Sequence, residues 1–507
     1  MSAWLSKHLT RECFRNRIAA QRGHQGTSQV DVGAWQAHVS SRGDSAMRNR
    51  VFVKAPAGSG LQSIEGSWAP SILQLIRLRR DPIRFGALRR KRFGPVGATR
   101  LLGAPMVMAT GAQAAEEVLV NRDKAFSNGG GWNLVIGPFF PRGLMLLDFD
   151  EHRAHRRIMQ EAFTPAALRG YFTRLDPVAR AAADELAGGQ VELYPYFKDL
   201  TLRIAAEVFV DVELTDEEYL RLATAFTDTV RAGTTLLRLR IPGSRYARGF
   251  AGRRYLEDFF TAHLPAKRAA DGSDLFSRLC QATTDDGQRF SDDDVVNHMI
   301  FVLMAAHDTT QIALTQLGYQ LARHPRWQQR VYDEIASLPQ ELTYDDLGAD
   351  RLPVLDRVLR ETLRMCTPVP GYPRRAVKDT AILGRYIPAG TRVTVPSLTN
   401  HNSNEQVWEH AETFDPDRFL PERFTQVHRF AWTPFGGGAH KCIGMYFAMR
   451  EITLLYVHLL RRFELSVPSG YTAPMDYSAL PIPTDGLPVT LTPRQDRNDL
   501  TVIRSPE

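Results

Sequence analysis

Hydrophobic positions in the middle of the chain recur at spacings of three and four residues. The spacing is clear over residues 202–209 and continues through residues 163–323, which predicts a mainly helical region. Ser291-Asp-Asp-Asp294 is a good helix start and Arg323-His-Pro325 a good stop, so we expect one helix of about 50 Å between them. Beyond residue 375, short segments such as residues 391–395 lie between turn residues and predict strands.

The two ends of the chain differ from this pattern. We expect residues 1–54, which are polar and Arg-rich, to form an N-terminal extension, residues 55–495 one large domain, and residues 496–507 a C-terminal tail. Residues 11–22 leave two interpretations open: a poorly ordered tail, or a basic amphipathic helix that lies on a membrane. No apolar run reaches about 18 residues, so we expect no transmembrane anchor.

Composition and charge narrow the class of protein. The 507 residues, 43% of them hydrophobic, can bury a large core. The net charge is +7, but acidic and basic residues are interspersed, so a nucleic-acid partner is not indicated. Cysteines stand only at positions 13, 280, 366 and 442, without the spacing of a disulfide framework or a zinc site. We therefore expect a monomeric cytoplasmic protein, either soluble or peripherally associated with a membrane.

One cysteine stands in a glycine-rich segment that runs from a loop into a helix. Residues 434–448 read Pro-Phe-Gly-Gly-Gly-Ala-His-Lys-Cys-Ile-Gly-Met-Tyr-Phe-Ala. Glycines let a backbone approach a flat cofactor, and backbone N–H groups can hydrogen-bond to a sulfur. The following helix would place its positive end near the thiolate of Cys442. The alternative is a structural cysteine beside a turn.

This segment closely resembles the haem-binding loop of the cytochrome P450 family, Phe-x-x-Gly-x-His/Arg-x-Cys-x-Gly. The resemblance implies a haem b cofactor (iron protoporphyrin IX) with Cys442 as the proximal iron ligand. It also implies that His440 reaches a haem propionate and that Phe435 and Gly438 belong to the cofactor site. The fold it implies is mainly α: a triangular, helical domain with a small β-rich region and the haem between two long helices.

An acid and an alcohol lie in the middle of the longest predicted helix, in Ala305-Ala-His-Asp-Thr-Thr310. A Thr309 hydroxyl that competes for backbone carbonyls can open the helix locally, and with Asp308 it could relay protons to activated oxygen. The alternative is a structural salt bridge for Asp308 and a helix back-bond for Thr309. The motif resembles the family's Ala/Gly-Gly-x-Asp/Glu-Thr-Thr/Ser, except that Ala306 replaces the usual glycine and leaves less room above the iron.

A Glu and an Arg on one helical face form a further motif, Glu361-Thr-Leu-Arg364. Together with Phe414-Asp-Pro-Asp-Arg-Phe419 it resembles the family's Glu-x-x-Arg helix and Pro-x-Arg-Phe segment. The resemblance implies a buried network of Glu361, Arg364 and Arg418. Arg423, in a second similar segment, stays open as an alternative to Arg418.

Haem propionates need cationic or hydrogen-bonding partners. His152 and Arg156 are four residues apart on one helical face and resemble the family's Trp/His-x-x-x-Arg helix. Arg374 resembles the basic residue that binds the other propionate, and Arg375 stays open as the alternative.

The resemblance, which covers about residues 55–490, implies a monooxygenase that inserts one oxygen atom of O₂ into its substrate. Residues 135–140 and 435–438 look closest to bacterial, actinobacterial-type members related to sterol 14-demethylases, which suggests an apolar steroid, terpenoid or lipid. Candidate pocket walls by family position are Trp132, Phe139, Phe140, Met304, Val369, Tyr372 and residues 480–483.

The chain shows no flavin- or dinucleotide-binding segment, so two electrons must come from elsewhere. We expect ferredoxin and an NAD(P)H-dependent ferredoxin reductase as partners. Arg153, Arg157 and Lys441 could form the basic docking patch for an acidic ferredoxin. Two other classes stay open as alternatives: a peroxide-using or isomerising haem-thiolate enzyme, and a haem protein that only binds a gas or ligand.

Overall fold

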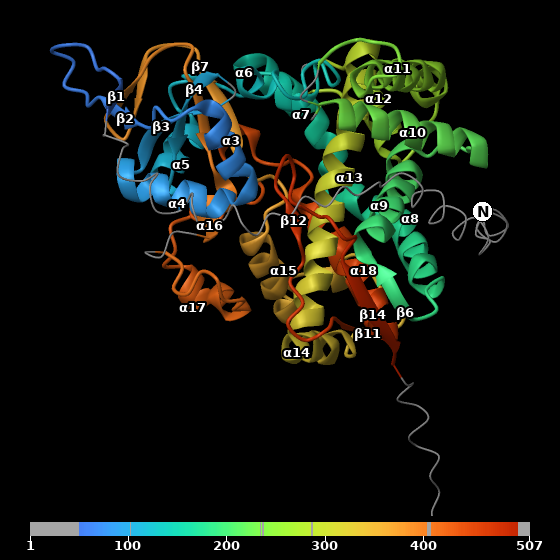
Figure 1. Ribbon diagram of the computed structural model, residues 1–507. Coiled ribbons are helices and arrows are strands. Elements are labelled where there is room, and N and C mark those ends of the chain that lie inside the picture. Colours follow the sequence, from blue (N-terminus) through green and yellow to red (C-terminus); the bar gives the residue numbers. More distant parts are fainter. Residues whose placement is uncertain are drawn as a thin grey trace, which may run out of the picture.

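A single long helix runs through the middle of the molecule (Figure 1). In the computed structural model, α13 spans Asp292–Arg323, and the Ser291 hydroxyl caps it by accepting from the N–H of Asp294 (3.1 Å). The helix ends at His324, where α14 begins with a proline. Both predicted ends of this helix are confirmed.

The structure describes residues 50–101, 103–233, 235, 238–284, 287–402 and 407–494. The predictions for most of the N-terminal extension, for residues 11–22, for Cys13 and for the C-terminal tail lie outside these residues. The first described strand begins at Arg50, slightly before the expected domain start.

Helices make up most of the described chain. The α-helices besides α13 are α3 (Ser71–Arg80), α4 (Pro82–Phe93), α5 (Ala112–Val120), α6 (Asn128–Trp132), α7 (Phe149–Gln160), α8 (Pro165–Asp184), α9 (Leu193–Ile204), α10 (Asp216–Gly233), α11 (Arg245–Ala269), α12 (Leu275–Gln281), α14 (Pro325–Ile335), α15 (Pro353–Met365), α16 (Ser397–Asn402), α17 (Pro421–Phe424) and α18 (Met445–Arg462). Short 3₁₀ segments are η2 (Leu144–Leu146), η3 (Glu161–Phe163), η5 (Asp345–Leu347), η6 (Pro416–Phe419) and η7 (Gly438–His440), and η4 (Ala205–Val210) is a π-helix.

The strands form one larger sheet and three small ones. They are β1 (Arg50–Val53), β2 (Ile64–Gly66), β3 (Val96–Leu101), β4 (Ala104–Ala109), β5 (Phe126–Ser127), β6 (Gly189–Glu192), β7 (Tyr372–Ala376), β8 (Thr380–Ile382), β9 (Arg385–Ile387), β10 (Arg392–Val395), β11 (Phe463–Ser466), β12 (Met475–Asp476), β13 (Ile482–Pro483) and β14 (Pro488–Pro493). The larger sheet has the order β1-β2-β3-β4-β10-β7-β5, and β11-β14-β6, β12-β13 and β8-β9 are the others.

The register of the larger sheet determines to which face each side chain of β7 points. β10 runs parallel to β4 and antiparallel to β7, where Val393 pairs with Arg374. Because side chains alternate along a strand, Arg374 and Arg375 point to opposite faces, and Arg374 is buried while Arg375 is exposed.

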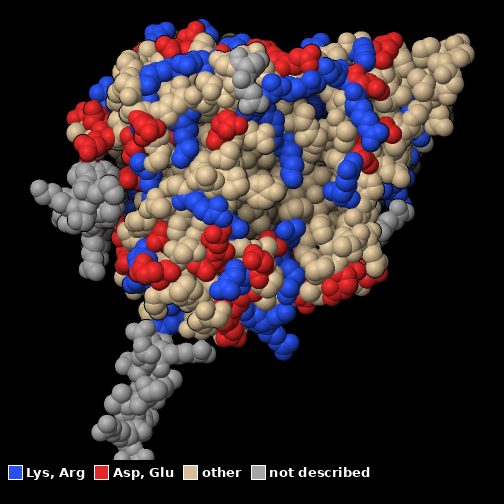
Figure 2. Space-filling model, turned by 180° about the vertical axis from the view of Figure 1, so that it is seen from behind, with Lys and Arg blue, Asp and Glu red and all other residues tan. Residues whose placement is uncertain are grey.

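The helices bury one large hydrophobic core, and a smaller core lies against the larger sheet. α18 belongs to the large core. Within the described residues one helical stretch, Gly438–Arg462, is apolar enough to cross a membrane (mean hydropathy 1.2), but 61% of its apolar window lies inside the protein. On the face opposite to that in Figure 1, basic and acidic side chains mix around a hollow of uncharged residues (Figure 2). The expected mainly helical fold with a small β-rich part is confirmed.

Candidate active site

The glycine-rich segment folds into a tight loop that presents Cys442. The N–H of Cys442 donates to the carbonyl of Phe435 (2.9 Å), and the N–H of Lys441 donates to the carbonyl of Gly438 (3.1 Å). Gly438 has a φ of +64°, and a Cβ added there would lie 2.0 Å from the carbonyl oxygen of Leu119. Position 438 therefore requires glycine for two separate reasons.

The environment of the Cys442 thiol differs from that of the other described cysteines. Burial raises the pKa of Cys280 to about 11 and that of Cys366 to about 12, and both side chains are fully enclosed. Burial also raises the pKa of Cys442, but a Gly444 N–H and two cations act in the opposite direction. The Cys442 side chain is accessible although protein surrounds it densely, as expected of a thiol in the wall of an internal recess. α18 begins at Met445, three residues after Cys442, and the positive N-terminal end of this helix favours a thiolate.

Two aromatic side chains hold the start of the cysteine loop. The hydroxyl of Tyr372 donates to the carbonyl of Thr433 (2.6 Å) and accepts from the N–H of Gly436 (2.9 Å). His401 Nε2 accepts from the N–H of Thr433 (2.9 Å). Sequence reasoning missed both positioning roles; it named Tyr372 only as a pocket wall.

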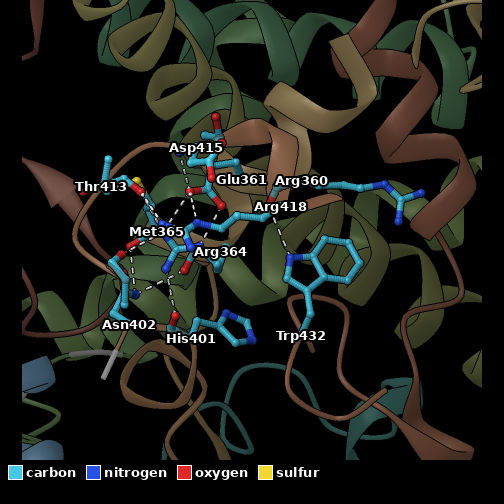
Figure 3. A network of polar contacts seen from close by, with 12 residues as sticks. Arg360, Glu361, Arg364, Met365, His401, Asn402, Thr413, Asp415, Arg418 and Trp432 are labelled. Carbon is cyan, nitrogen blue, oxygen red and sulfur yellow. Dashed lines mark hydrogen bonds and ion pairs between the residues drawn. The ribbon is translucent and has the colours of Figure 1, made fainter. Parts of the chain in front are cut away.

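A buried ion network stands behind this loop (Figure 3). Glu361 binds Arg364 in a two-pronged pair, with Nε at 2.7 Å and Nη2 at 2.9 Å, and Arg418 Nε lies 3.3 Å from Glu361 Oε1. The N–H of Asp415 adds a bond of 2.9 Å to the same oxygen. Arg364 Nη1 also donates to the carbonyl of His401 (2.9 Å), so the network continues to the cysteine loop. Because each charge has partners, the cost of burying the network is offset.

The structure distinguishes the two arginines that the sequence left open for this network. Arg418 is 5% exposed and reaches Glu361. Arg423 is an exposed side chain that pairs with Asp415 (3.1 Å) rather than with Glu361.

Four basic side chains from three parts of the chain meet beside the loop. His152 and Arg156 come from α7, Arg374 from β7 and His440 from the loop itself. The rings of His152 and His440 lie 3.8 Å apart, centroid to centroid. Burial, then the charge of Arg156, lowers the pKa of His152 to about 4. Burial and the three neighbouring bases lower the pKa of His440 further, and burial lowers that of Arg374 to about 10.

This cluster fits the two carboxylates of a haem. His152 Nε2 is buried without a hydrogen-bond partner among the described residues. Asp148 is the acidic group whose charge acts on both His152 and Arg374, so the bases outnumber the acids. Buried, mutually repelling bases with an unpaired nitrogen are stabilised by a bound anion.

The middle of α13 is accessible, although the turns before and after it are buried. Ala305 is exposed, and Met304, Ala306, Asp308 and Thr309 are half-buried. The Thr309 hydroxyl donates to the carbonyl of Ala305 at 2.6 Å. This is the helix back-bond that was weighed as the structural alternative, on the same face that the relay would use.

His307 is a residue of this helix that sequence reasoning missed. Its ring is 1% exposed, its Nδ1 lies 2.9 Å from Asp308 Oδ1, and its Nε2 lies 2.9 Å from the carbonyl of Lys198. The partner of Asp308 is therefore a histidine from its own helix, bonded in turn to α9.

Two of the candidate pocket walls are ordinary core. Phe139 and Phe140 are each 1% exposed, and Phe139 packs on Tyr246 and Phe250. Phe435 is half-buried beside Trp432, with ring centroids 6.3 Å apart.

Comparison with known proteins agrees with this geometry. A model of the family "Cytochrome P450" matches residues 66–489. The chain is 45% identical over 454 residues to the putative cytochrome P450 136 of Mycobacterium tuberculosis, covering 88% of this chain and 92% of that protein. It is 30% identical to the pentalenene oxygenase of Streptomyces avermitilis, with 83% and 93% covered.

Solved structures give the same result for the fold. The retinoic-acid-bound cyanobacterial CYP120A1 superposes with a TM-score of 0.76 at 27% identity, covering 85% of this chain and 98% of that one. From the family match, the relatives and the shared fold it follows that this chain belongs to the cytochrome P450 family.

Proposed function

We propose that this protein oxygenates an apolar terpenoid-class substrate in a haem site built on Cys442, with electrons from a separate ferredoxin. Membership of the family makes the protein a monooxygenase with a haem cofactor. The observation that carries the site assignment is the pairing of one accessible, densely surrounded thiol with a cluster of four bases. When bound, haem supplies the iron at which O₂ is activated.

Each residue near the cofactor has a role that its position supports. Cys442 would ligate the iron, with the Gly444 N–H tuning the sulfur. Phe435 and Gly438 shape the loop, since only a glycine fits at position 438. The propionates would be bound by His152, Arg156, Arg374 and His440; Arg375 faces away.

Asp308 and Thr309 would deliver protons to the reaction. Both side chains belong to the accessible stretch of α13. To donate to a ligand, the Thr309 hydroxyl must leave the carbonyl of Ala305. Turnover of O₂ to product and water consumes two protons, which these side chains are placed to pass.

The relatives favour a terpenoid over a sterol. The named ones include pentalenene oxygenase, taxane 10-beta-hydroxylase of Taxus cuspidata and the CYP120A1 structure with retinoic acid. Pentalenene, taxanes and retinoic acid are terpenoids, and none of them is a sterol. The resemblance to sterol 14-demethylases receives no support from these relatives.

A basic patch on α7 would receive the electron donor. Arg153 and Arg157 are exposed and Lys441 is exposed beside the iron ligand, while His152 and Arg156 on the same helix turn inward. Arg153 pairs with Asp150 at 3.5 Å, so part of its charge is already compensated. An acidic ferredoxin would be attracted to this patch, which shares α7 and the cysteine loop with the residues of the proposed haem site.

Within the described chain, the exposed apolar side chains of α3 support a peripheral membrane contact. Ile72, Leu73 and Ile76 are exposed at 61%, 48% and 54%, and Arg77 and Arg80 follow on the same helix. A helix with one exposed apolar stretch beside cations suits the surface of an anionic bilayer.

Sedimentation with anionic and zwitterionic vesicles tests this membrane contact. We expect binding to anionic vesicles that Ile72→Ser with Ile76→Ser removes and that Leu220→Ser, an equally exposed site on α10, leaves intact; binding that ignores the α3 changes would contradict it.

The function itself is tested with ferredoxin, ferredoxin reductase, NAD(P)H and ¹⁸O₂ on a terpenoid library. We expect one labelled oxygen atom in the product and NAD(P)H consumption in proportion. Product formed from peroxide alone, isomerised product without label, or ligand binding without turnover would instead indicate one of the other haem-protein classes.

A further inference from the structure

The ring of His307 has two hydrogen bonds that together fix how many protons it shares with Asp308. A backbone carbonyl can only accept, so the bond of 2.9 Å from His307 Nε2 to the Lys198 carbonyl requires a proton on Nε2. The bond of 2.9 Å between Nδ1 and Asp308 Oδ1 requires a second proton between those two atoms. It belongs either to Nδ1, giving an imidazolium and a carboxylate, or to Asp308, giving two neutral groups.

In both arrangements the pair carries the same second proton and the same net charge of zero. We propose that His307 and Asp308 jointly hold one transferable proton for the reaction, with His307 as the positioning residue and Asp308 as the group that releases it. The inference rests on the proposed monooxygenase function, in which RH + O₂ + 2 e⁻ + 2 H⁺ gives ROH + H₂O with the electrons from ferredoxin. Without timely protons, O₂ + 2 e⁻ + 2 H⁺ gives H₂O₂ instead.

Protein encloses the pair on the side of His307, and the side of Asp308 is accessible. The His307 side chain is 1% exposed, and the Phe226 ring of α10 stands edge-on to it with centroids 5.2 Å apart. The Asp308 side chain is 19% exposed, on the accessible stretch that also holds Thr309. A proton on the pair can therefore leave only through Asp308.

Charged and titratable groups from the neighbouring elements also act on Asp308. These groups are Lys198 and Tyr194 of α9. The charge of Arg231 of α10 acts in turn on Lys198 and Tyr194. Burial, then Arg231, lowers the pKa of Lys198, and burial, then the charge of Asp308, raises the pKa of Tyr194 to about 12. These groups leave the proton count of the pair unchanged, because the Lys198 carbonyl still requires Nε2–H.

Two variants separate the proton from the hydrogen bond. His307→Phe keeps a ring against Phe226 and removes both nitrogens, so Asp308 loses the group with which it shares the proton. Asp308→Asn keeps a donor to Nδ1, because the amide N–H can replace the carboxyl, but it has no proton to release. His458→Phe is the matched control, because His458 of α18 forms a similar pair with Asp176 of α8 (2.8 Å), outside the site.

The first measurement is product per NAD(P)H in the full haem enzyme between pH 5 and 8. We expect tight coupling for the native protein and His458→Phe, and a several-fold loss with matching peroxide for His307→Phe. Asp308→Asn should lose coupling at every pH. Coupling in His307→Phe that equals that of the native protein would overturn the proposal.

The second measurement does not depend on turnover: ¹⁵N NMR of histidine-labelled protein, with the His307 signals assigned by their loss in His307→Phe. We expect Nε2 to carry a proton and a second proton to be shared between Nδ1 and Asp308. A bare Nε2, or an Nδ1 without a shared proton, would overturn the proposal even if the enzyme oxygenates its substrate. The reverse result, a shared proton without oxygenation, would count against the proposed function alone.

Discussion

The imidazole rings of His152 and His440 lie 3.8 Å apart, centroid to centroid, and tilt by 32° from one another. One ring comes from α7 and the other from the cysteine loop. Two stacked imidazoles next to two arginines cannot all be charged without strong repulsion, and the pKa of each histidine is accordingly lowered, mainly by burial. The arrangement makes the site selective for an anion.

Arg374 and Arg375 offer a direct comparison of two neighbouring arginines on one strand. Arg374→Leu should weaken haem binding on the order of 100-fold, because a buried propionate would lose its charged partner. Arg375→Leu should leave it nearly unchanged, because that side chain is exposed. Haem transfer to apomyoglobin measures the loss rate for each; equal rates would contradict the assignment.

Arg418 and Arg423 form a similar pair for stability. Arg418→Leu leaves Glu361 buried with one partner fewer and should lower the free energy of unfolding by about 3–5 kcal/mol. Arg423→Leu removes an exposed ion pair and should cost less than about 1 kcal/mol. Urea unfolding of both proteins at equal haem loading measures the difference, and the opposite order would assign the network to Arg423.

Acid should destabilise the fold through buried histidines. Burial lowers the pKa of both His298 and His401 to about 3, with the charge of His155 acting on the first and that of Arg364 on the second. Unfolded histidines titrate near about 6.5, so between these values the unfolded chain binds more protons. The contribution of these two neutral histidines to the free energy of unfolding is fully present above pH 6.5. It falls as the pH drops towards 3, by up to a few kcal/mol for each group.

The pH effect of His401 can be separated from that of the carboxyl groups. His401→Gln keeps an oxygen that can accept the Thr433 N–H bond but does not titrate. Its free energy of unfolding, measured in urea at pH 7, 6 and 5, should fall less steeply than that of the native protein. Parallel curves would show that His401 does not contribute.

Charge reversal tests the electron-donor patch. Arg153→Glu with Arg157→Glu should slow reduction by ferredoxin about 10-fold at low salt and leave reduction by dithionite unchanged, because only the protein donor is steered by charge. Arg326→Glu, an exposed arginine of α14, is the control. A ferredoxin rate that responds to neither salt nor the double change would place the docking site elsewhere.

The sequence predicted the parts of the site that depend on side-chain type at a fixed spacing. Cys442, Asp308 and Thr309 are candidates found this way and their roles stay predictions, whereas α13 is confirmed with both ends. The roles of His307 and His401 were missed because their partners include the backbone carbonyl of Lys198 and the N–H of Thr433, which carry no residue-type signal. Only strand register could distinguish Arg374 from Arg375.

The spectrum of the ferrous carbon monoxide complex tests the central claim, that Cys442 ligates the haem iron. A serine hydroxyl is a poor donor to this iron, so Cys442→Ser should lose the long-wavelength Soret band of thiolate-ligated haem. Cys366→Ser, a change at an enclosed cysteine, should keep it. If Cys442→Ser retains the thiolate band at normal haem content, Cys442 is not the iron ligand.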